Sequence, residues 1–504
     1  MLEREAKLVA PAGFRFPRLG GPDDGFLAEP QPARRYTTTY WDTPDLRLAR
    51  WGASLRYRDD EGWTVRLPAE AEEAAGVLVR DEHTLDGKAG KVNGKAGKVP
   101  EEATALLRIY VRSAPLQPVV LLRTVRQPVE LRNAAGERLA ELVDDQVQVV
   151  EGRRVVDRFR ELEVELGDGA QPDTLDKVLA RLQEAGATQA VEQLDKYRRA
   201  LGDREVGPPE LQVGDLDHDA SVEQLLRYDL AASTMRLFRH EPGVRLGEDP
   251  EAVHQARVGI RRLRSTLRTF KPLLDQEWVG RLRDELKWLA NLLGDVRDAE
   301  VLHARLTRRV AGLPDGDAAA AGRLLQDLVG QRDAARERLL HGMEERRYTA
   351  LLDDLVAAAQ APAVLPEAAG LASEASPPLV AKAWRRLRKA VKRAGATPSD
   401  EALHQIRIRA KRARYAAEAV KPVLGKPARA FAKAASNLQD ELGEQHDAVV
   451  AEAWLRETAG SSRGTTALAA GQLIAAERTA AQAARERWRP AWKTVAGKKR
   501  TGWL

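Results

Sequence analysis

The chain of 504 residues contains no cysteine, which excludes disulfide bonds and thiolate metal sites. This absence is typical of proteins from a reducing compartment. The sequence also lacks any apolar run approaching the ~20 residues that a membrane-spanning helix needs. Its first residues, MLEREAKLVA, have neither the basic start nor the apolar stretch of a secretory signal peptide. We therefore expect a cytoplasmic protein with no membrane partner.

Aromatic residues are also scarce, at 5% of the chain, which leaves few side chains on which the bases of a nucleic acid could stack. The sequence has no Gly-rich phosphate loop, no Ser/His/Asp arrangement and no zinc-spaced cluster of His and Cys. The formal net charge of +6 is modest for this length. Local clusters of charge therefore carry more information about partners than the total charge does.

One basic segment occurs twice, as HQARVGIRRLRSTL from His254 and as HQIRIRAKRARYAA from His404. A second echo follows each copy: LGDVRDAEV, which contains Asp298, and LGEQHDAVV, which contains Asp447. A repeat of this length predicts two copies of one helical unit. After the histidine, both copies place their cations at the same positions, which are Arg257, Arg261, Arg262 and Arg264 in the first and Arg407, Lys411, Arg412 and Arg414 in the second.

The spacing of these cations predicts an amphipathic helix in each copy. The histidine and the cations at +3, +7 and +10 fall within an arc of roughly 80° when each residue turns the helix by about 100°. Residues 254–271 hold six Lys or Arg and no acid, and residues 382–393 hold seven and no acid. Solvated helix faces usually mix both signs, because like charges repel. This concentration of positive charge favours a polyanion partner over a merely solvated face.

The two parts of the chain differ in pattern. Residues 1–202 contain short alternating segments such as LRYR, WTVRL and ELEVEL, which are typical of antiparallel strands. From residue 218 onward, Ala, Leu, Arg and Glu recur at helical spacing, with breaks at 241–250, 311–316 and 362–378. We therefore expect an α+β protein, with a linker over 203–217 and an all-α domain over 218–498 whose halves cover about 218–360 and 378–498. The Gly- and Lys-rich insert at 87–99 is expected to be a mobile loop.

Acids and cations occupy alternate positions of the predicted strands. If these strands form a barrel, several carboxylates and several arginines point inward together; a solvated charged face is the alternative for each strand alone. Carboxylates bind Mg²⁺ or Mn²⁺ through hard oxygen ligands, and guanidinium groups hold phosphate oxygens. The pattern thus suits phosphoryl chemistry with a metal-activated water. The residues concerned are Glu3, Glu5 and Lys7 in the first strand, Glu161, Glu163 and Glu165 in a late strand, and Arg56, Arg58, Arg66, Arg80, Arg123 and Arg126 between them.

The first segment, EREAK, resembles the ExExK signature of CYTH domains, the triphosphate tunnel metalloenzymes. The resemblance covers residues 1–202 and continues in order through YWDT, LRYR, RDE, RTVR, AELVDD, ELEVE and KY. Arg66 stands where this family often has lysine, which keeps the charge. The resemblance implies an antiparallel β-barrel tunnel, with Glu3, Glu5 and Lys7 as catalytic residues. It further implies an Mg²⁺ or Mn²⁺ site at Glu3, Glu5, Asp145, Glu161, Glu163 and Glu165, with Asp144 as the alternative to Asp145. The implied substrate contacts are Arg56, Arg58, Arg66, Arg80, Arg123, Arg126 and Lys196.

The repeated basic segment resembles the CHAD domain, the conserved histidine α-helical domain, over residues 218–498. This resemblance implies two pseudo-symmetric helical bundles whose basic surface binds inorganic polyphosphate, and an association with polyphosphate granules. The implied contacts are His254, Arg257, Arg261, Arg262, Arg264, His404, Arg407, Lys411, Arg412 and Arg414. Asp298 and Asp447 are expected to orient the cations or to cap helices.

The leading hypothesis is a metal-dependent triphosphatase that hydrolyses inorganic triphosphate or the ends of polyphosphate and is tethered to long polyphosphate by its helical domain. The alternative is a polyphosphate-binding scaffold without turnover. Nucleic-acid binding ranks lower, because the basic helices carry few aromatic residues. Nucleotide cyclisation, which occurs among relatives of the first domain, requires a nucleoside pocket that the sequence does not identify.

Overall fold

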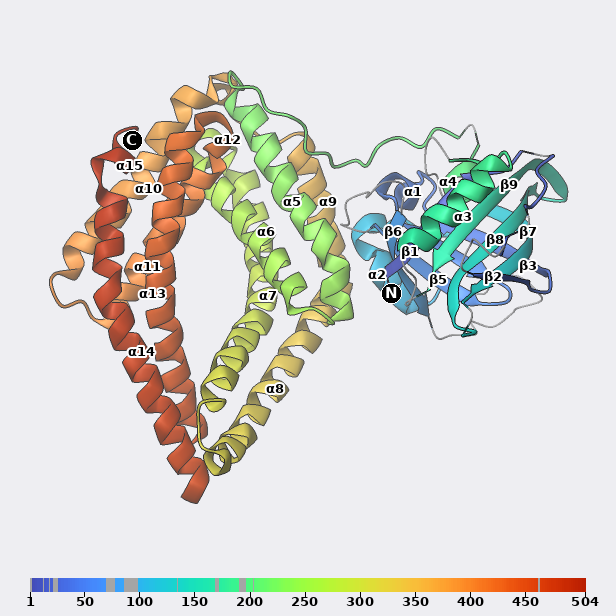
Figure 1. The fold of residues 1–504 in the computed structure, drawn as a ribbon. Coiled ribbons are helices and arrows are strands. Elements are labelled where there is room, and N and C mark those ends of the chain that lie inside the picture. Colours follow the sequence, from blue (N-terminus) through green and yellow to red (C-terminus); the bar gives the residue numbers. More distant parts are fainter. Residues whose placement is uncertain are drawn as a thin grey trace. The chain divides into compact units, whose positions relative to one another are not determined.

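The computed structural model describes residues 2–11, 13–17, 19–20, 26–68, 78–85, 98–133, 135–167, 172–189, 196–202, 204–460 and 463–504. For residues 2–5, 78–81, 172–173 and 189 it describes the backbone alone. All but the last two residues of the predicted loop at 87–99 lie outside these ranges. The chain separates into two compact units, Met1–Glu210 and Leu211–Leu504 (Figure 1). No helix in the described ranges is long and apolar enough to cross a membrane.

The first unit is built on an antiparallel sheet in the order β10-β1-β6-β5-β4-β3-β7-β8-β9, with β2 paired to β7. Strand β1 pairs with β6 along its first half and with β9 along its second half. The predicted antiparallel sheet is thus confirmed. The strands are β1 (Leu2–Val9), β2 (Leu27–Pro30), β3 (Arg34–Asp42), β4 (Ser54–Arg58), β5 (Gly62–Leu67), β6 (Leu78–Leu85), β7 (Gln117–Arg132), β8 (Arg138–Glu151), β9 (Arg154–Leu166) and β10 (Thr188–Gln189), and the helices are α1 (Arg47–Trp51), α2 (Glu101–Val111), α3 (Pro172–Glu184) and α4 (Lys196–Ala200).

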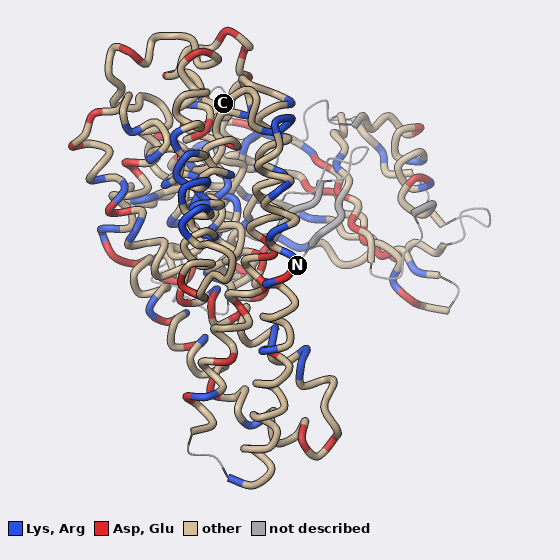
Figure 2. Tube along the Cα trace, turned by 90° about the vertical axis from the view of Figure 1, so that its left-hand side faces the viewer, with Lys and Arg blue, Asp and Glu red and all other residues tan. Residues whose placement is uncertain are grey.

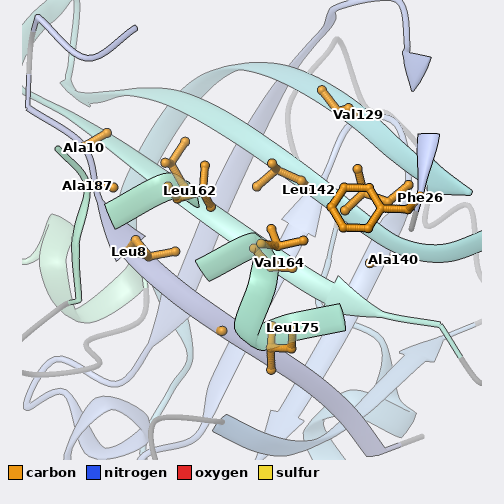
Figure 3. Packing of buried hydrophobic residues seen from close by; sticks show 14 of the residues in the cluster. Leu8, Ala10, Phe26, Val129, Ala140, Leu142, Leu162, Val164, Leu175 and Ala187 are labelled. Atoms are coloured by element: carbon orange, nitrogen blue, oxygen red, sulfur yellow. The ribbon is translucent and has the colours of Figure 1, made fainter. Parts of the chain in front are cut away.

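An apolar cluster covers one face of β1, β8 and β9. Leu8, Leu162 and Val164 are fully buried there and pack near Leu175 of α3 (Figure 3). Because successive strand residues point to opposite faces, burial of these positions turns Lys7 and its odd-numbered neighbours on β9 to the other face. We call that other face the inner face. The alternation in ELEVEL therefore decides which residues can form a site.

Part of the inner face is apolar. Tyr40, Leu122 and Phe159 pack there against Tyr197 of α4. The Tyr197 hydroxyl donates a 2.6 Å hydrogen bond to Asp42, which is fully buried and also accepts bonds from two backbone N–H groups of α1. The expectation of a polar interior therefore holds for only part of the sheet, because Tyr197 of α4 packs on another part together with apolar side chains of the strands.

The segment after α4 packs onto the first unit. The carboxylate of Glu210 accepts hydrogen bonds from Arg112 and from Trp51, and the Pro208 carbonyl accepts one from Arg50 at 2.8 Å. These contacts explain why the first compact unit extends to Glu210.

The second unit consists of helices in the part of the chain that the structure describes. Helices α6 and α11 are the two copies of the basic segment, and they contact each other. Their predicted apolar faces are confirmed, since Ala256, Ile260 and Ile406 are buried. The long helices are α5 (Val222–Leu246), α6 (Pro250–Thr269), α7 (Gln276–Val310), α8 (Asp315–Glu344), α9 (Arg346–Gln360), α10 (Ala372–Ala394), α11 (Asp400–Ala419), α13 (Lys426–Thr458) and α14 (Gly464–Ala496), and the short ones are η1 (Lys271–Leu273), η2 (Pro366–Ala369), α12 (Lys421–Leu424) and α15 (Lys498–Thr501).

Two of the predicted breaks are wrong in extent, because prolines lie inside helices. Helix α5 continues through Pro242, and α10 already contains Pro377 and Pro378. Proline fits the helical φ angle but removes a donor and crowds the carbonyl of the preceding turn, so packing of its neighbours must hold the helix together at these positions. In α5, buried Glu241 accepts a 2.7 Å hydrogen bond from Arg245 one turn later.

Candidate functional site

A cluster of opposite charges lies on the inner face where β1, β8 and β9 meet α4. The Lys7 ammonium is 3.0 Å from a carboxylate oxygen of Glu163 and 3.5 Å from one of Glu161. The Lys196 ammonium is 2.7 Å from Asp145 and 2.9 Å from Glu163. The structure therefore brings together five residues that the sequence assigned to one tunnel.

Arg126 of β7 completes this cluster. Its guanidinium donates two hydrogen bonds to Asp145, at 2.9 and 2.7 Å, and one of 3.3 Å to Glu163. Burial opposes ionisation of both acids, but Lys196 and Arg126 outweigh it and lower their pKa values. These two carboxylates are therefore charged at neutral pH.

Glu161 differs from its neighbours. Burial raises its pKa to about 7, although Lys196 and Lys7 partly offset the effect. One of its carboxylate oxygens is buried without a hydrogen-bond partner. A carboxyl group of this pKa can accept or release a proton near neutral pH.

The arginines of β4 and β5 face the same side of the sheet. Arg56 and Arg66 both bond to Glu82 of β6, the former at 2.9 Å. The guanidinium of buried Arg58 lies 3.8 Å from the centre of the Tyr36 ring. The sequence did not assign a role to Glu82 or Tyr36. Glu82 belongs to the quoted RDE motif, so its place beside the arginines was a signal that could have been used.

The structure does not bring all predicted tunnel residues together. Arg123 is exposed and lies on the opposite face of β7 from Arg126, because three positions separate them on an alternating strand. Glu165 is exposed near the end of β9. The side chains of Glu3, Glu5 and Arg80 lie outside the described part of the structure, where the backbone register pairs Glu3 with Arg80 and Glu5 with Glu165.

The donor chemistry of the inner-face cluster fits a divalent cation. The three carboxylates of Asp145, Glu161 and Glu163 supply hard oxygen ligands, and the Glu161 oxygen that lacks a hydrogen bond lies 3.5 Å from the Lys7 ammonium. Among the described residues, however, no group of three acids or histidines is arranged to hold a metal ion. Lys7 and Lys196 neutralise the carboxylates, so further acids would be needed to retain a cation.

The helical unit contains a central cavity between α6, α7, α11 and α13, with a volume of about 300 Å³. Figure 2 shows Lys and Arg positions gathered along neighbouring helices of this unit. Both repeats contribute to the cavity. The charged and imidazole side chains that line it are His254, Arg257, Arg261, Arg297, Asp298, Arg305, Arg407, Lys411, His446 and Asp447.

Two arginines of the central cavity each have a buried N–H group that donates no hydrogen bond. The Nε atoms of Arg261 and Arg407 are buried without a hydrogen-bond partner. Asp298 accepts a 2.7 Å bond from Arg257, whereas Asp447 lies 3.8 Å from Arg407. The two aspartates therefore contact one cation in each repeat and leave other donors of the cavity unpaired.

More basic than acidic side chains line the central cavity, and the pKa values of two of its bases are lowered. Burial, with Arg407, Arg261 and Arg257, lowers the pKa of Lys411 to about 7. Burial and Arg407 lower that of His446 to about 4. Each base resists protonation mainly because it is buried, and the neighbouring cations add to this effect, so a bound anion would be favoured.

The later cations of the basic segments lie away from the central cavity. Helices α6 and α11 contact each other, and Arg261 and Arg414 approach the same Tyr415 ring at 5.9 and 5.4 Å. There Arg414 and Arg262 are 2.7 and 3.6 Å from Glu418. Arg264 and Arg412 do not line the central cavity either.

Sequence reasoning missed His446, Arg297 and Arg305. His404 does not line the central cavity but lies 3.3 Å from His446, between their Nδ1 atoms. His446 and Arg297 each precede the aspartate of the second echo. The repeated segments around Asp298 and Asp447 were the available signal. Arg297 and His446 occupy the same position in these two segments, directly before the aspartate.

Comparison with known proteins gives matches to both units. Family models described as CYTH domain and CHAD domain match residues 1–196 and 229–456. Two uncharacterized proteins of Mycobacterium tuberculosis, from strains CDC 1551 / Oshkosh and ATCC 25618 / H37Rv, are each 32% identical over 504 residues, 91% of this chain and 89% of the relative.

Solved structures resemble parts of the chain. PptA from Streptomyces chartreusis is 29% identical, with 54% of this chain and 100% of that chain covered and a TM-score of 0.45. The CHAD domain from the plant Ricinus communis is 29% identical, with 58% and 96% covered and a TM-score of 0.44. The family matches and the relatives together show that this chain belongs to the CYTH and CHAD families, with one domain of each.

Proposed function

We propose that the CYTH domain hydrolyses inorganic triphosphate or the ends of polyphosphate, and that the central cavity of the CHAD domain binds inorganic polyphosphate. The observation that carries the proposal is the pairing of two anion sites in one chain. One joins Lys7, Arg126 and Lys196 to three carboxylates. The other collects guanidinium groups from both repeats, two of which have a buried Nε atom without a hydrogen-bond partner. The CYTH and CHAD families support a role connected with triphosphate or polyphosphate.

In the CYTH domain, arginine forks suit the oxygens of a triphosphate, because each guanidinium can donate two parallel hydrogen bonds. Arg56, Arg58 and Arg66 would bind the anion, while Lys7 and Lys196 offset the charge that develops on its oxygens. Glu161 has a pKa of about 7 without a cation, so it would release a proton when a cation binds near neutral pH. We assign no nucleophilic side chain.

A divalent cation, Mg²⁺ or Mn²⁺, would be held by Glu3, Glu5, Asp145, Glu161, Glu163 and Glu165, and when bound it would neutralise phosphate oxygens and acidify water. CYTH domains are a metal-dependent family, which supports this cofactor. The neutralised carboxylates favour a second candidate, in which the tunnel binds anions without turnover and the protein is a polyphosphate scaffold.

Phosphate release from tripolyphosphate separates the two candidates. With Mg²⁺ or Mn²⁺ we expect release that EDTA abolishes and that the Glu3→Gln/Glu5→Gln variant lowers at least about 100-fold, since even outer-shell changes at metal sites cost about 10- to 100-fold. The control variant is Glu101→Gln/Glu102→Gln, at two exposed acids that begin α2. Unchanged turnover in the Glu3/Glu5 variant would remove the metal assignment, and no release from the native protein would favour the scaffold.

Binding of polyphosphate should depend on pH through Lys411. Below its pKa of about 7 the ammonium is already charged; above it, binding of a polyanion must be accompanied by uptake of a proton. Affinity should therefore fall between pH 7 and 9, by at most about tenfold per pH unit. The pKa values of His254 and His446, which face the same cavity, are lowered, so these groups titrate below this window.

Titration calorimetry at several pH values, in buffers of different ionisation enthalpy, measures both affinity and proton uptake. The Lys411→Arg variant is the matched control, because arginine stays charged throughout this range. An equal pH dependence in the native protein and the variant would refute the role of Lys411.

A further inference from the structure

The CHAD domain holds a second cationic cavity, here called the side cavity. It lies between the C-terminal part of α6, η1, α10 and α11, has a volume of about 310 Å³, and shares no lining residue with the central cavity. All its charged lining residues are positive, and its other lining residues are neutral. The positive residues are Arg268, Lys271, Lys382, Arg386, Arg409 and Arg412.

A neighbouring cavity of about 640 Å³ extends the side cavity along α10. The two share Arg386 and Arg409, and the neighbour adds Lys389 and Arg393. With Lys382, the cations of α10 follow at spacings of four, three and four, which places them in one row on the helix. At about 1.5 Å of rise per residue, this row is about 16 Å long.

We call this surface the α10 track. Within the described part of the chain, no ion pair joins any of its members to an acid. An isolated exposed arginine often lacks a partner, but here cations from three helices converge on adjoining cavities. The track consists of Arg268, Lys382, Arg386, Lys389, Arg393, Arg409 and Arg412.

The repeat supplies an internal comparison. Residues 150 positions apart correspond in the two halves, and the counterpart of the side cavity, between α5, α6, α11 and α13, contains two acids. One is Glu418, which neutralises Arg414 at 2.7 Å; the other is Asp229. The residues that correspond to Glu418 and Asp229 in the side cavity are Arg268 and Leu379.

This comparison shows that the counterpart cavity carries acids of its own among its cations, whereas all charged residues that line the side cavity are positive. In the side cavity the cations repel one another. Burial, together with Arg412, Arg283 and Arg264, lowers the pKa of Arg268 to about 10. A bound anion would relieve this repulsion in the place where the counterpart cavity carries its own carboxylates.

We propose that the α10 track binds a linear condensed phosphate as a second site for polyphosphate, separate from the central cavity. The inference rests on the proposed polyphosphate-binding function. A single phosphate can reach only a few of the seven cations, whereas a chain with a charge on every unit can follow a row of about 16 Å. The central cavity and the track together would hold one long chain at two places, which raises its affinity above that of either site.

The test compares two variants of the full-length protein that differ only in which face of α10 is changed. Lys382→Glu/Arg386→Glu reverses two charges of the track, and Arg385→Glu/Arg388→Glu reverses two on the same helix that line none of these cavities. All four side chains are exposed, so both variants should fold.

Affinity for long-chain polyphosphate is measured by calorimetry at several salt concentrations. We expect the track variant to lose at least about tenfold in affinity relative to the control variant, and its dependence on salt to be shallower by about one unit of slope, because fewer counterions are released. Equal affinities of the two variants would overturn the proposal. Equal competition by single-stranded DNA would overturn the assignment of the ligand as condensed phosphate.

A variant of the central cavity distinguishes this proposal from the function on which it rests. If Arg257→Ala/Arg407→Ala weakens binding while the track variant does not, the track proposal fails and the proposed function stands. If the track variant alone weakens binding, the central cavity is wrongly assigned and the track stands. If the native protein does not bind polyphosphate, both fail.

Discussion

Replacing Arg257 and Arg407 with alanine should lower the affinity for long-chain polyphosphate by at least about 100-fold. These arginines occupy corresponding positions of α6 and α11 and face the same cavity. A hydrogen bond to a charged group contributes about 1.5–3 kcal/mol, so loss of one from each arginine amounts to about two powers of ten or more. The double variant should fold, because neither arginine has a strong buried partner. Arg257 pairs with the exposed Asp298, and the distance of 3.8 Å between Arg407 and Asp447 is long for an ion pair.

The matched control is Arg308→Ala/Arg323→Ala, which removes two exposed arginines that do not line the cavity. Calorimetry at increasing salt should show weaker binding of the native protein at every step, with a shallower slope for the cavity variant. Equal losses in the two variants would mean that total charge, rather than the central cavity, determines binding. Binding that does not respond to salt would contradict the electrostatic mode altogether.

Replacing Lys196 with methionine should lower kcat for triphosphate hydrolysis by about 100- to 1000-fold. Its ammonium lies within 3 Å of Asp145 and Glu163, on the inner face where we place the reaction. Loss of one preorganised charge at a developing oxyanion typically has an effect of this size. Lys196 also contributes to lowering the pKa of Glu161, so its removal should raise that pKa above about 7 and move the pH–rate profile to higher pH.

The same change leaves buried carboxylates with one partner fewer, which can destabilise the domain by about 3–5 kcal/mol. Urea unfolding measures that effect separately from catalysis. The Lys196→Arg variant keeps the positive charge and should recover part of kcat, together with the native pH profile. A folded methionine variant with native kcat and an unshifted profile would exclude Lys196 from the reaction.

The sequence predicts the inner-face cluster well where alternation is strict. Leu162 and Val164 alternate with Glu161 and Glu163, and burial of the apolar pair decides the orientation of the acids. The same rule argues against placing both Arg123 and Arg126 in one tunnel, because three positions on a regular strand separate opposite faces. The aromatic filling beneath α4 was not predictable, since it depends on where a short helix packs rather than on any local pattern.

In the helical domain, periodicity predicts the apolar and basic faces of α6 and α11 but not their crossing. Arg261 and Arg414 both belong to the basic face that the spacing predicts for their helices. Arg261 nevertheless lines the central cavity, whereas Arg414 is paired with Glu418. The difference arises because two helices that cross can share a cavity over only a few turns. Pro242 was misread for a related reason, since packing of the surrounding helix outweighs the loss of one hydrogen bond.

The contribution of both repeats to the central cavity has a consequence for its origin. A single repeat carries only one wall, so a precursor of half the length could form the site only by self-association, at a strength set by its concentration. Fusion of two copies makes this association intramolecular and independent of dilution. It also allows each copy to change independently of the other. At one pair of corresponding positions, for example, the first copy has Arg268 and the second has Glu418.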